Sequence, residues 1–335
     1  MNLDKAIRYT KVVLDEVFVH DDTQNAIIVY DENSTLSQVL SKAYRHNLPN
    51  AIHIDFDATQ PEKIREQLDT LEASDLVILI QSTNFRLDAF RIRVELFKRK
   101  IKVLEHPHLG RMSEDEVSHY IDAIEYDKTY IRQTGRNLKA KIDASSKGTV
   151  YSGDEALHFP AGFESAKMNI GDYSQMPNTG GQFPIGEVFT ESKELTALHG
   201  RATICSFANT SYRVNVPPKP ITIIIEGGRV VGCEDSTPAF DEILALIREG
   251  EEGEVWVREL GFGLNRGFSK TKIVSDIGSY ERMCGVHLSL GRKHGMYGKT
   301  GFKRGDGKFH IDIFVDTKTV TFDDDVVFEN EAWCV

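Results

Sequence analysis

Short apolar runs alternate with amphipathic segments through the first third of the chain. The runs are rich in β-branched residues, as buried parallel strands are, and they predict strands over Asn25–Tyr30, Ala51–Ile54, Asp75–Ile80 and Ile101–Leu104. The segments between them have apolar residues at helical spacing, and they predict a helix that Ser34 caps and Asn47–Asn50 ends, followed by helices over Pro61–Leu71 and Phe85–Phe97. Because such an alternation requires crossover connections, we expect a doubly wound, mostly parallel α/β sheet.

A long amphipathic helix is expected to follow this region. Ser113 and Glu116 have the spacing of a capping box, in which each side chain bonds a backbone N–H of the other residue. An apolar stripe then continues along one face through Val117, Tyr120, Ile121, Ile124, Ile131, Leu138 and Ile142. We interpret Ser145–Gly148, where the helix should end, as a domain boundary. Residues 1–147 would then form an α/β scaffold domain, and residues 148–335 a second domain.

The second domain has shorter apolar segments and more frequent turns. Two β-type runs, Ile221–Ile225 and Arg229–Val231, flank a Gly-Gly pair and predict a hairpin. A single helix, Pro238–Arg248, interrupts this β-rich region. The pattern predicts an α+β domain with a mainly antiparallel sheet or an open barrel.

Composition narrows the class of protein. The chain has 335 residues, 40% of them hydrophobic, which is enough for two ordinary globular domains. Its formal charge of −11 disfavours nucleic acid and anionic membranes as partners. No apolar run is long enough for a membrane span, and the first residues lack the apolar core of a secretory signal, so we expect a cytoplasmic protein. The four cysteines are scattered, which favours reduced thiols over disulfides or a zinc knot.

The first domain offers little candidate chemistry. The turn after its first strand, Asp31–Ser34, lacks the glycine-rich sequence through which a pyrophosphate approaches the backbone, so we exclude a dinucleotide site. Two histidines flank a proline in Glu105–His108. Without a nearby cysteine or aspartate they define no metal geometry, and we interpret this segment as a polar loop after an edge strand.

Potential metal ligands occur in the second domain, each beside apolar or glycine-rich sequence. His310 and Asp312 are two residues apart, so on a strand both side chains project from one face. Imidazoles and carboxylates are ligands for divalent ions. Five such residues together predict a metal site, namely Glu187, Glu259, His287, His310 and Asp312.

The segments around these ligands resemble the signature blocks of the M29 family of metallo-aminopeptidases, the aminopeptidase T type. The blocks are Pro184–Thr190, Glu259–Asn265, Val286–Gly291 and His310–Asp312, and they occur in the family's order with similar spacing. The resemblance covers residues 148–328 well and the first domain only as an α/β layout. It implies two divalent ions (zinc, cobalt or manganese). Glu259 would bridge them, and the other four ligands would complete their coordination. It also implies a homodimer.

The same resemblance implies the reaction, in which metal-activated water cleaves an N-terminal aminoacyl or related amide bond. The substrate would be a small molecule or a short peptide. In the family a tyrosine seven residues after the first histidine assists, whereas this chain has His294 there and its nearest tyrosine is Tyr297. The catalytic candidates are therefore Glu187, His294 and Tyr297. The loop charges Arg266, Lys299, Lys303 and Arg304 are interpreted as solvated.

Two alternatives remain open. The Fe(II) dioxygenases that open 2,5-dihydroxypyridine resemble the chain at the Gly-x-Gly-Leu block and at His-x-Asp, and they carry histidine where Glu259 stands. A facial triad of two imidazoles and one carboxylate would then hold one iron. The third possibility is a non-catalytic binding protein on the same fold. Metal content and the requirement for oxygen distinguish the three.

Overall fold

The computed structural model describes residues 2–87, 91–174, 176 and 178–335. The chain divides into two compact units, and each is described by itself. Unit 1 comprises Met1–Arg132, Gly171–Ile185 and Thr271–Ser279, and unit 2 comprises Gln133–Ile170, Gly186–Lys270 and Tyr280–Val335. The expected boundary between two domains at residues 147 and 148 stays a prediction.

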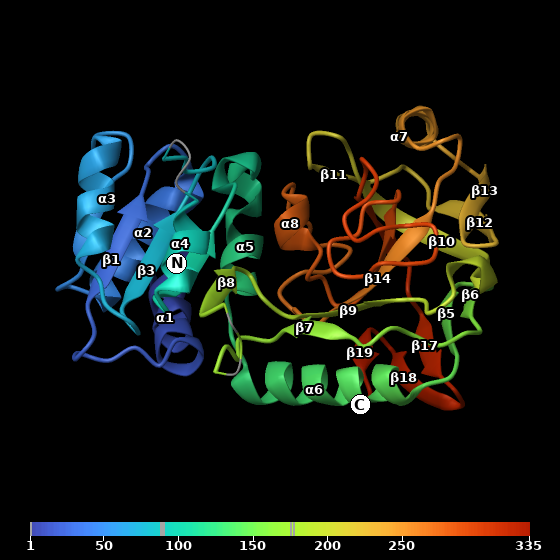
Figure 1. The fold of residues 1–335 in the computed structure, drawn as a ribbon, viewed down its shortest axis with the longest axis horizontal. Coiled ribbons are helices and arrows are strands. Elements are labelled where there is room, and N and C mark those ends of the chain that lie inside the picture. Colours follow the sequence, from blue (N-terminus) through green and yellow to red (C-terminus); the bar gives the residue numbers. More distant parts are fainter. Residues whose placement is uncertain (1, 88–90, 175, 177) are drawn as a thin grey trace. The chain divides into compact units, whose positions relative to one another are not determined.

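Unit 1 contains a five-stranded sheet in the order β2-β1-β3-β4-β8, with every neighbouring pair parallel. The predicted strands are confirmed as β1 (Ala26–Tyr30), β2 (Ile52–Asp55), β3 (Leu76–Ile80) and β4 (Lys102–His106). The fifth strand, β8 (Gly180–Gln182), comes from later in the chain and had no apolar run to reveal it. Figure 1 shows the first four strands in blue to cyan with helices packed around them.

The helices of unit 1 largely follow the predicted segments. Ser34 caps its helix through a capping box with Ser37, and Leu36 and Leu40 bury its apolar face. The predicted helix Phe85–Phe97 is shorter, because it begins only at Ile92; residues 88–90 lie outside the described part of the chain. The helices are α1 (Asn2–Val12, continued by a π-helical turn over Val13–Val17), α2 (Thr35–Asn47), α3 (Pro61–Asp69), α4 (Ile92–Lys98) and α5 (Val117–Ala123).

The long helix expected from Ser113 is two helices. The capping box of Ser113 and Glu116 is present, but α5 ends at Ala123 and α6 (Lys128–Ala144) begins anew. Asp127 explains the break, because its side chain accepts from the backbone N–H of Tyr130 at 3.0 Å as a helix N-cap does. The stripe of apolar residues is buried as predicted, although it spans both helices.

The prediction of a polar loop at Glu105–His108 is also wrong for Glu105 and His106, which belong to β4. His106 ends β4, which is not an edge strand because β8 pairs with it. Its ring is fully buried between two tyrosines, with Tyr44 Oη 2.8 Å from Nε2 and Tyr120 Oη 2.9 Å from Nδ1. Burial lowers the pKa of His106 to about 3. It is therefore a neutral core residue.

Unit 2 is built on a fourteen-stranded antiparallel sheet, which confirms the β-rich expectation. The main path runs β19-β18-β17-β5-β6-β10-β16-β15-β14-β9-β7, and β11, β12 and β13 branch from β10. The predicted hairpin is β12 and β13, joined by Gly227 and Gly228, which both have positive φ. The branch strands and the two ends of the path are β11 (Val214–Asn215), β12 (Ile221–Glu226), β13 (Arg229–Glu234), β19 (Ala332–Trp333), β18 (Asp325–Glu329), β17 (Thr319–Phe322), β5 (Gly148–Ser152), β6 (Glu155–Phe159) and β7 (Lys167–Asn169).

The centre of this sheet carries the candidate ligands. Its strands are β9 (Glu187–Glu191), β10 (His199–Ala208), β14 (Val257–Gly263), β15 (Gly285–Leu290) and β16 (Ile311–Val315). Two further helices are α7 (Pro238–Gly250), as predicted, and the short α8 (Ile277–Tyr280). Among the described residues, none of the helices combines the length and apolarity needed to cross a membrane.

Candidate metal centre

Four neighbouring strands of unit 2 bring the candidate ligands to one face. In the antiparallel register, Glu187 of β9 lies opposite Gly263 of β14, and His287 of β15 lies opposite Gly261. Asp312 of β16 pairs in turn with Ser289 of β15. Paired residues in antiparallel strands project on the same side, and so do residues two apart. Glu187, His287 and Asp312 therefore share a face although 125 residues separate the first and last in sequence.

Two glycines of β14 make room for this arrangement. A Cβ on Gly261 would lie 2.0 Å from Cε1 and 2.1 Å from Nε2 of the His287 ring. A Cβ on Gly263 would lie 1.8 Å from Met283 O. Glycine at this position therefore lets the backbone of Met283, the residue after Arg282, pack directly against β14. The Glu-x-Gly-x-Gly sequence thus combines one candidate ligand with two glycines that let the His287 ring and the Met283 backbone lie close to β14.

Glu259 lies at the centre of the site, in an irregularity of β14. The register with β15 shifts between Val257 and Leu260, as in a β-bulge, which re-aims side chains next to functional sites. Ser289 Oγ accepts from Glu259 N at 2.9 Å and fixes the backbone there. Oε1 of Glu259 is 3.5 Å from Nε2 of His287, and Oε2 is 3.5 Å from Nε2 of His294. The two oxygens therefore face two different imidazoles.

Glu187 lies between an imidazole and a guanidinium. Its Oε1 is 3.5 Å from His287 Nε2, and its Oε2 is 3.2 Å from Arg282 Nη1. Arg282 is buried and also pairs with Glu281. Burial raises the pKa of Glu281 to about 8, and burial likewise raises the pKa of Glu187. The structure thus adds a buried cation and a further carboxyl group to the predicted set.

The other two histidines, His294 and His310, lie in the loop between β15 and β16, and His310 directly precedes β16. His310 Nε2 is 3.1 Å from Asp312 Oδ1, and His310 Nδ1 donates to Lys293 O at 3.1 Å. His294 is only 2% exposed, and its ring is 6.2 Å from that of His310. Tyr297 packs its ring edge against His294 at 5.1 Å, but its hydroxyl donates to Ser165 O at 2.7 Å. The structure therefore brings His294 to the ligands and turns the Tyr297 hydroxyl towards a backbone carbonyl.

Electrostatics at the site favour positive charge. Burial raises the pKa of Glu259, but the nearby histidines outweigh it and lower the pKa to about 2. Burial lowers the pKa values of His287 and His310, but the surrounding carboxylates outweigh it and raise them to about 9 and 10. For His294 burial dominates and lowers the pKa to about 4. The carboxylates thus stabilise positive charge on His287 and His310, whereas the imidazole of His294 stays neutral.

The residues present fit a divalent metal. Several buried atoms of the described residues lack a hydrogen-bond partner, and three of them belong to the candidate ligands and to His294, namely His287 Nε2, His294 Nε2 and Asp312 Oδ1. Asp312 Oδ1 is close to His310 Nε2, but the two atoms do not have hydrogen-bond geometry. Buried polar atoms in native proteins are nearly always bonded, so such atoms need another role. One ligand atom each of Glu187, Glu259 and His287 lie within 4.8 Å of one another. Imidazole nitrogen and carboxylate oxygen at such separations suit zinc, manganese, cobalt or iron.

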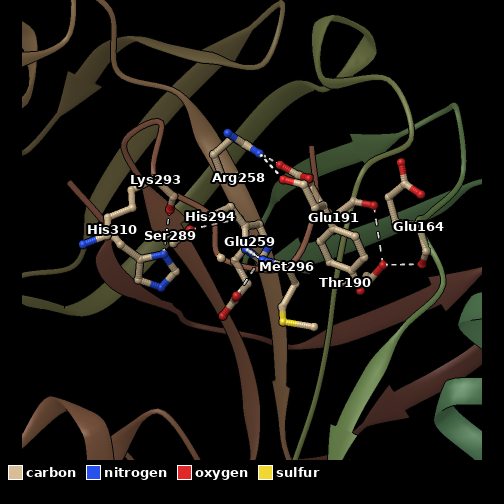
Figure 2. A network of polar contacts seen from close by, with 12 residues as sticks. Glu164, Thr190, Glu191, Arg258, Glu259, Ser289, Lys293, His294, Met296 and His310 are labelled. Carbon is tan, nitrogen blue, oxygen red and sulfur yellow. Dashed lines mark hydrogen bonds and ion pairs between the residues drawn. The ribbon is translucent and has the colours of Figure 1, made fainter. Parts of the chain in front are cut away.

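A buried ion network lies beside the site and was not predicted. Arg258 and Glu191 form an ion pair with fully buried side chains, and Lys299 lies 3.8 Å from Glu191. Figure 2 shows this pair beside Glu259. Lys299 also pairs with Glu164, so its expected role as a solvated loop charge is wrong. The only available sequence signals were Arg258 directly before Glu259, and Glu191 four residues after Glu187 on the same strand.

Comparisons with known proteins show the fold. Neither the family models nor the curated proteins contain a match to this chain. Among solved structures, 2,5-dihydroxypyridine dioxygenase from Pseudomonas putida is 14% identical with a TM-score of 0.61, covering 99% of this chain and 98% of that one. AmpT from Thermus thermophilus, an M29 aminopeptidase, is 12% identical with a TM-score of 0.58, covering 99% of both chains. The chain thus shares its fold with a dioxygenase and an aminopeptidase, at identities that leave the reaction open.

Proposed function

We propose that this protein is a metal-dependent hydrolase of the M29 aminopeptidase type, acting on an N-terminal aminoacyl or related amide bond. The observation that carries the proposal is Glu259, whose two oxygens face His287 and His294 at 3.5 Å each. A carboxylate whose two oxygens face two different imidazoles could hold one ion at each oxygen. Glu187, His287, His310 and Asp312 would complete the coordination.

Bound divalent ions would supply an activated water and polarise the carbonyl of the scissile amide. Residues of the chain would hold these ions in position and transfer protons. Arg282 holds one oxygen of Glu187, which leaves Oε1 facing the centre. That oxygen would bind an ion, so Glu187 would act through its position as a ligand. His294 and Tyr297 are the proposed catalytic residues for proton transfer.

A second candidate function has its own support. His310 and Asp312, with either His287 or His294, offer two imidazoles and one carboxylate, the set used by mononuclear Fe(II) oxygenases. The carboxylate at position 259 favours the hydrolase, because the dioxygenase type resembled by the sequence has histidine there. A homodimer, a cytoplasmic location and a short-peptide substrate remain proposals.

The test is turnover of unblocked aminoacyl amides and dipeptides with added zinc, cobalt or manganese, with N-acetylated substrates as the matched control. The hydrolase proposal expects cleavage of the unblocked substrates only, at equal rates with and without oxygen. Oxygen consumption with a dihydroxylated aromatic ring and Fe(II), and no amide cleavage, would assign the dioxygenase reaction. Absence of bound metal after every addition would leave the binding protein.

A further inference from the structure

The position of His294 differs from that of an ordinary loop histidine. It lies in the segment between β15 and β16, where its neighbours Lys293, Gly295 and Met296 are exposed, yet it is 2% exposed itself. Its carbonyl accepts from Gly305 N at 2.8 Å, which fixes its backbone. Figure 2 shows His294 next to Glu259. Histidine in an exposed glycine-rich loop would normally be solvated, so its burial needs a local cause.

The buried end of the ring carries a nitrogen without a hydrogen bond. His294 Nε2 is 3.5 Å from Glu259 Oε2, but it has no hydrogen-bond partner among the described residues. On the other side, Nδ1 is 3.5 Å from Met296 N, the upper limit of a hydrogen bond. Coordination through Nε2 would place the ring proton on Nδ1 and give up only this weak contact.

The ligand types around Glu259 are unequal on its two sides. Glu187 and His287 lie on the side of Oε1, which gives that side a carboxylate and an imidazole. His294 lies on the side of Oε2, with its ring 6.2 Å from that of His310, which in turn contacts Asp312. The second side therefore has two imidazoles and one carboxylate, and their ligand atoms are more widely spaced than those of Glu187, Glu259 and His287, which lie within 4.8 Å of one another.

We propose that His294 is a metal ligand which, with His310, Asp312 and one oxygen of Glu259, forms the nitrogen-rich member of two unequal metal positions. This rests on the proposed two-metal centre and replaces proton transfer as the role of His294. Imidazole-rich sets favour zinc, cobalt and iron, whereas carboxylate-rich sets suit manganese and magnesium. The two positions should consequently differ in metal preference and affinity.

The test titrates chelator-treated full-length protein with Co(II), following heat by calorimetry and the visible absorption of the bound ion. Wild type should bind two ions in two resolved steps. His294→Ala should keep the step that belongs to Glu187, Glu259 and His287, and should weaken the other more than 100-fold, since loss of an outer-shell partner costs only ~10–100-fold. His294→Phe, which keeps the ring packing against Tyr297, should behave alike if the alanine variant folds poorly.

Met296→Ala is the matched control, because it removes a neighbouring side chain of the same loop and leaves the backbone contact in place. It should retain both steps and the wild-type absorption. Two ions bound by His294→Phe within 100-fold of wild type would overturn the assignment while leaving the two-metal function intact. If wild type binds one ion and His294→Phe loses it, His294 is a ligand and the two-metal function falls.

Discussion

At the scale of single residues, Gly261 shows how closely the site is packed. Any side chain there would overlap the ring of His287 at about 2 Å, and the flanking strands hold both backbones in register. We expect Gly261→Ala to displace the His287 ring, to destabilise the protein by about 1–3 kcal/mol as overpacking does, and to weaken metal binding more than tenfold. Calorimetric metal titration and urea unfolding measure the two effects.

A control separates the ring clash from a general effect of adding a methyl group to a glycine. Gly232→Ala places its Cβ 3.5 Å from the nearest atom, an ordinary contact on β13. It should leave metal affinity at the wild-type value. Unchanged affinity in Gly261→Ala would mean that His287 does not need its present position to bind.

At the scale of elements, the loop between β15 and β16 depends on one buried carboxylate. Glu251, just after α7, is 2% exposed and accepts three backbone N–H groups. They are Arg292 N at 2.6 Å, Lys308 N at 2.8 Å and Phe309 N at 3.0 Å. Both ends of the segment that carries His294 are thus fixed to the same side chain.

Replacing this carboxylate should loosen the loop. Glu251→Gln turns one acceptor into a donor and leaves a buried N–H unpaired, at a cost of about 1–3 kcal/mol. Since the loop is rich in lysine and arginine, we expect tryptic cleavage between residues 292 and 309 to be at least tenfold faster. Glu252→Gln, an exposed neighbour that pairs only with the Arg292 side chain, is the control. Equal cleavage rates in both variants would rule out the pinning role.

The sequence predicted helices and strands well where apolar residues recur with a single period. The strands β1 to β4, the cap at Ser34 and the helix α7 follow from local patterns of apolar residues. Partners distant in sequence could not be predicted, because β8 has no apolar run and the bulge at Glu259 depends on its register with β15. The candidate ligands could be recognised in the sequence because apolar or glycine-rich residues surround them. The Arg258–Glu191 pair and Arg282 could not be recognised, because they resemble ordinary surface charges.

At the scale of the whole molecule, the fold does not determine the reaction. The dioxygenase and the aminopeptidase both match over nearly the full chain, so the reaction must follow from side chains rather than from topology. In this chain the deciding position is 259, where a carboxylate stands between imidazoles on two sides. The number of ions therefore carries more information than further structural likeness.

The most direct measurement is the metal content of anaerobically prepared wild type and Glu259→Gln, by elemental analysis after reconstitution and desalting. We expect two divalent ions per chain in wild type, loss of both in the variant because they share Glu259, and the same count after exposure to air. One iron per chain, with oxygen consumed on a hydroxylated aromatic ring, would contradict it, as would two ions retained by Glu259→Gln.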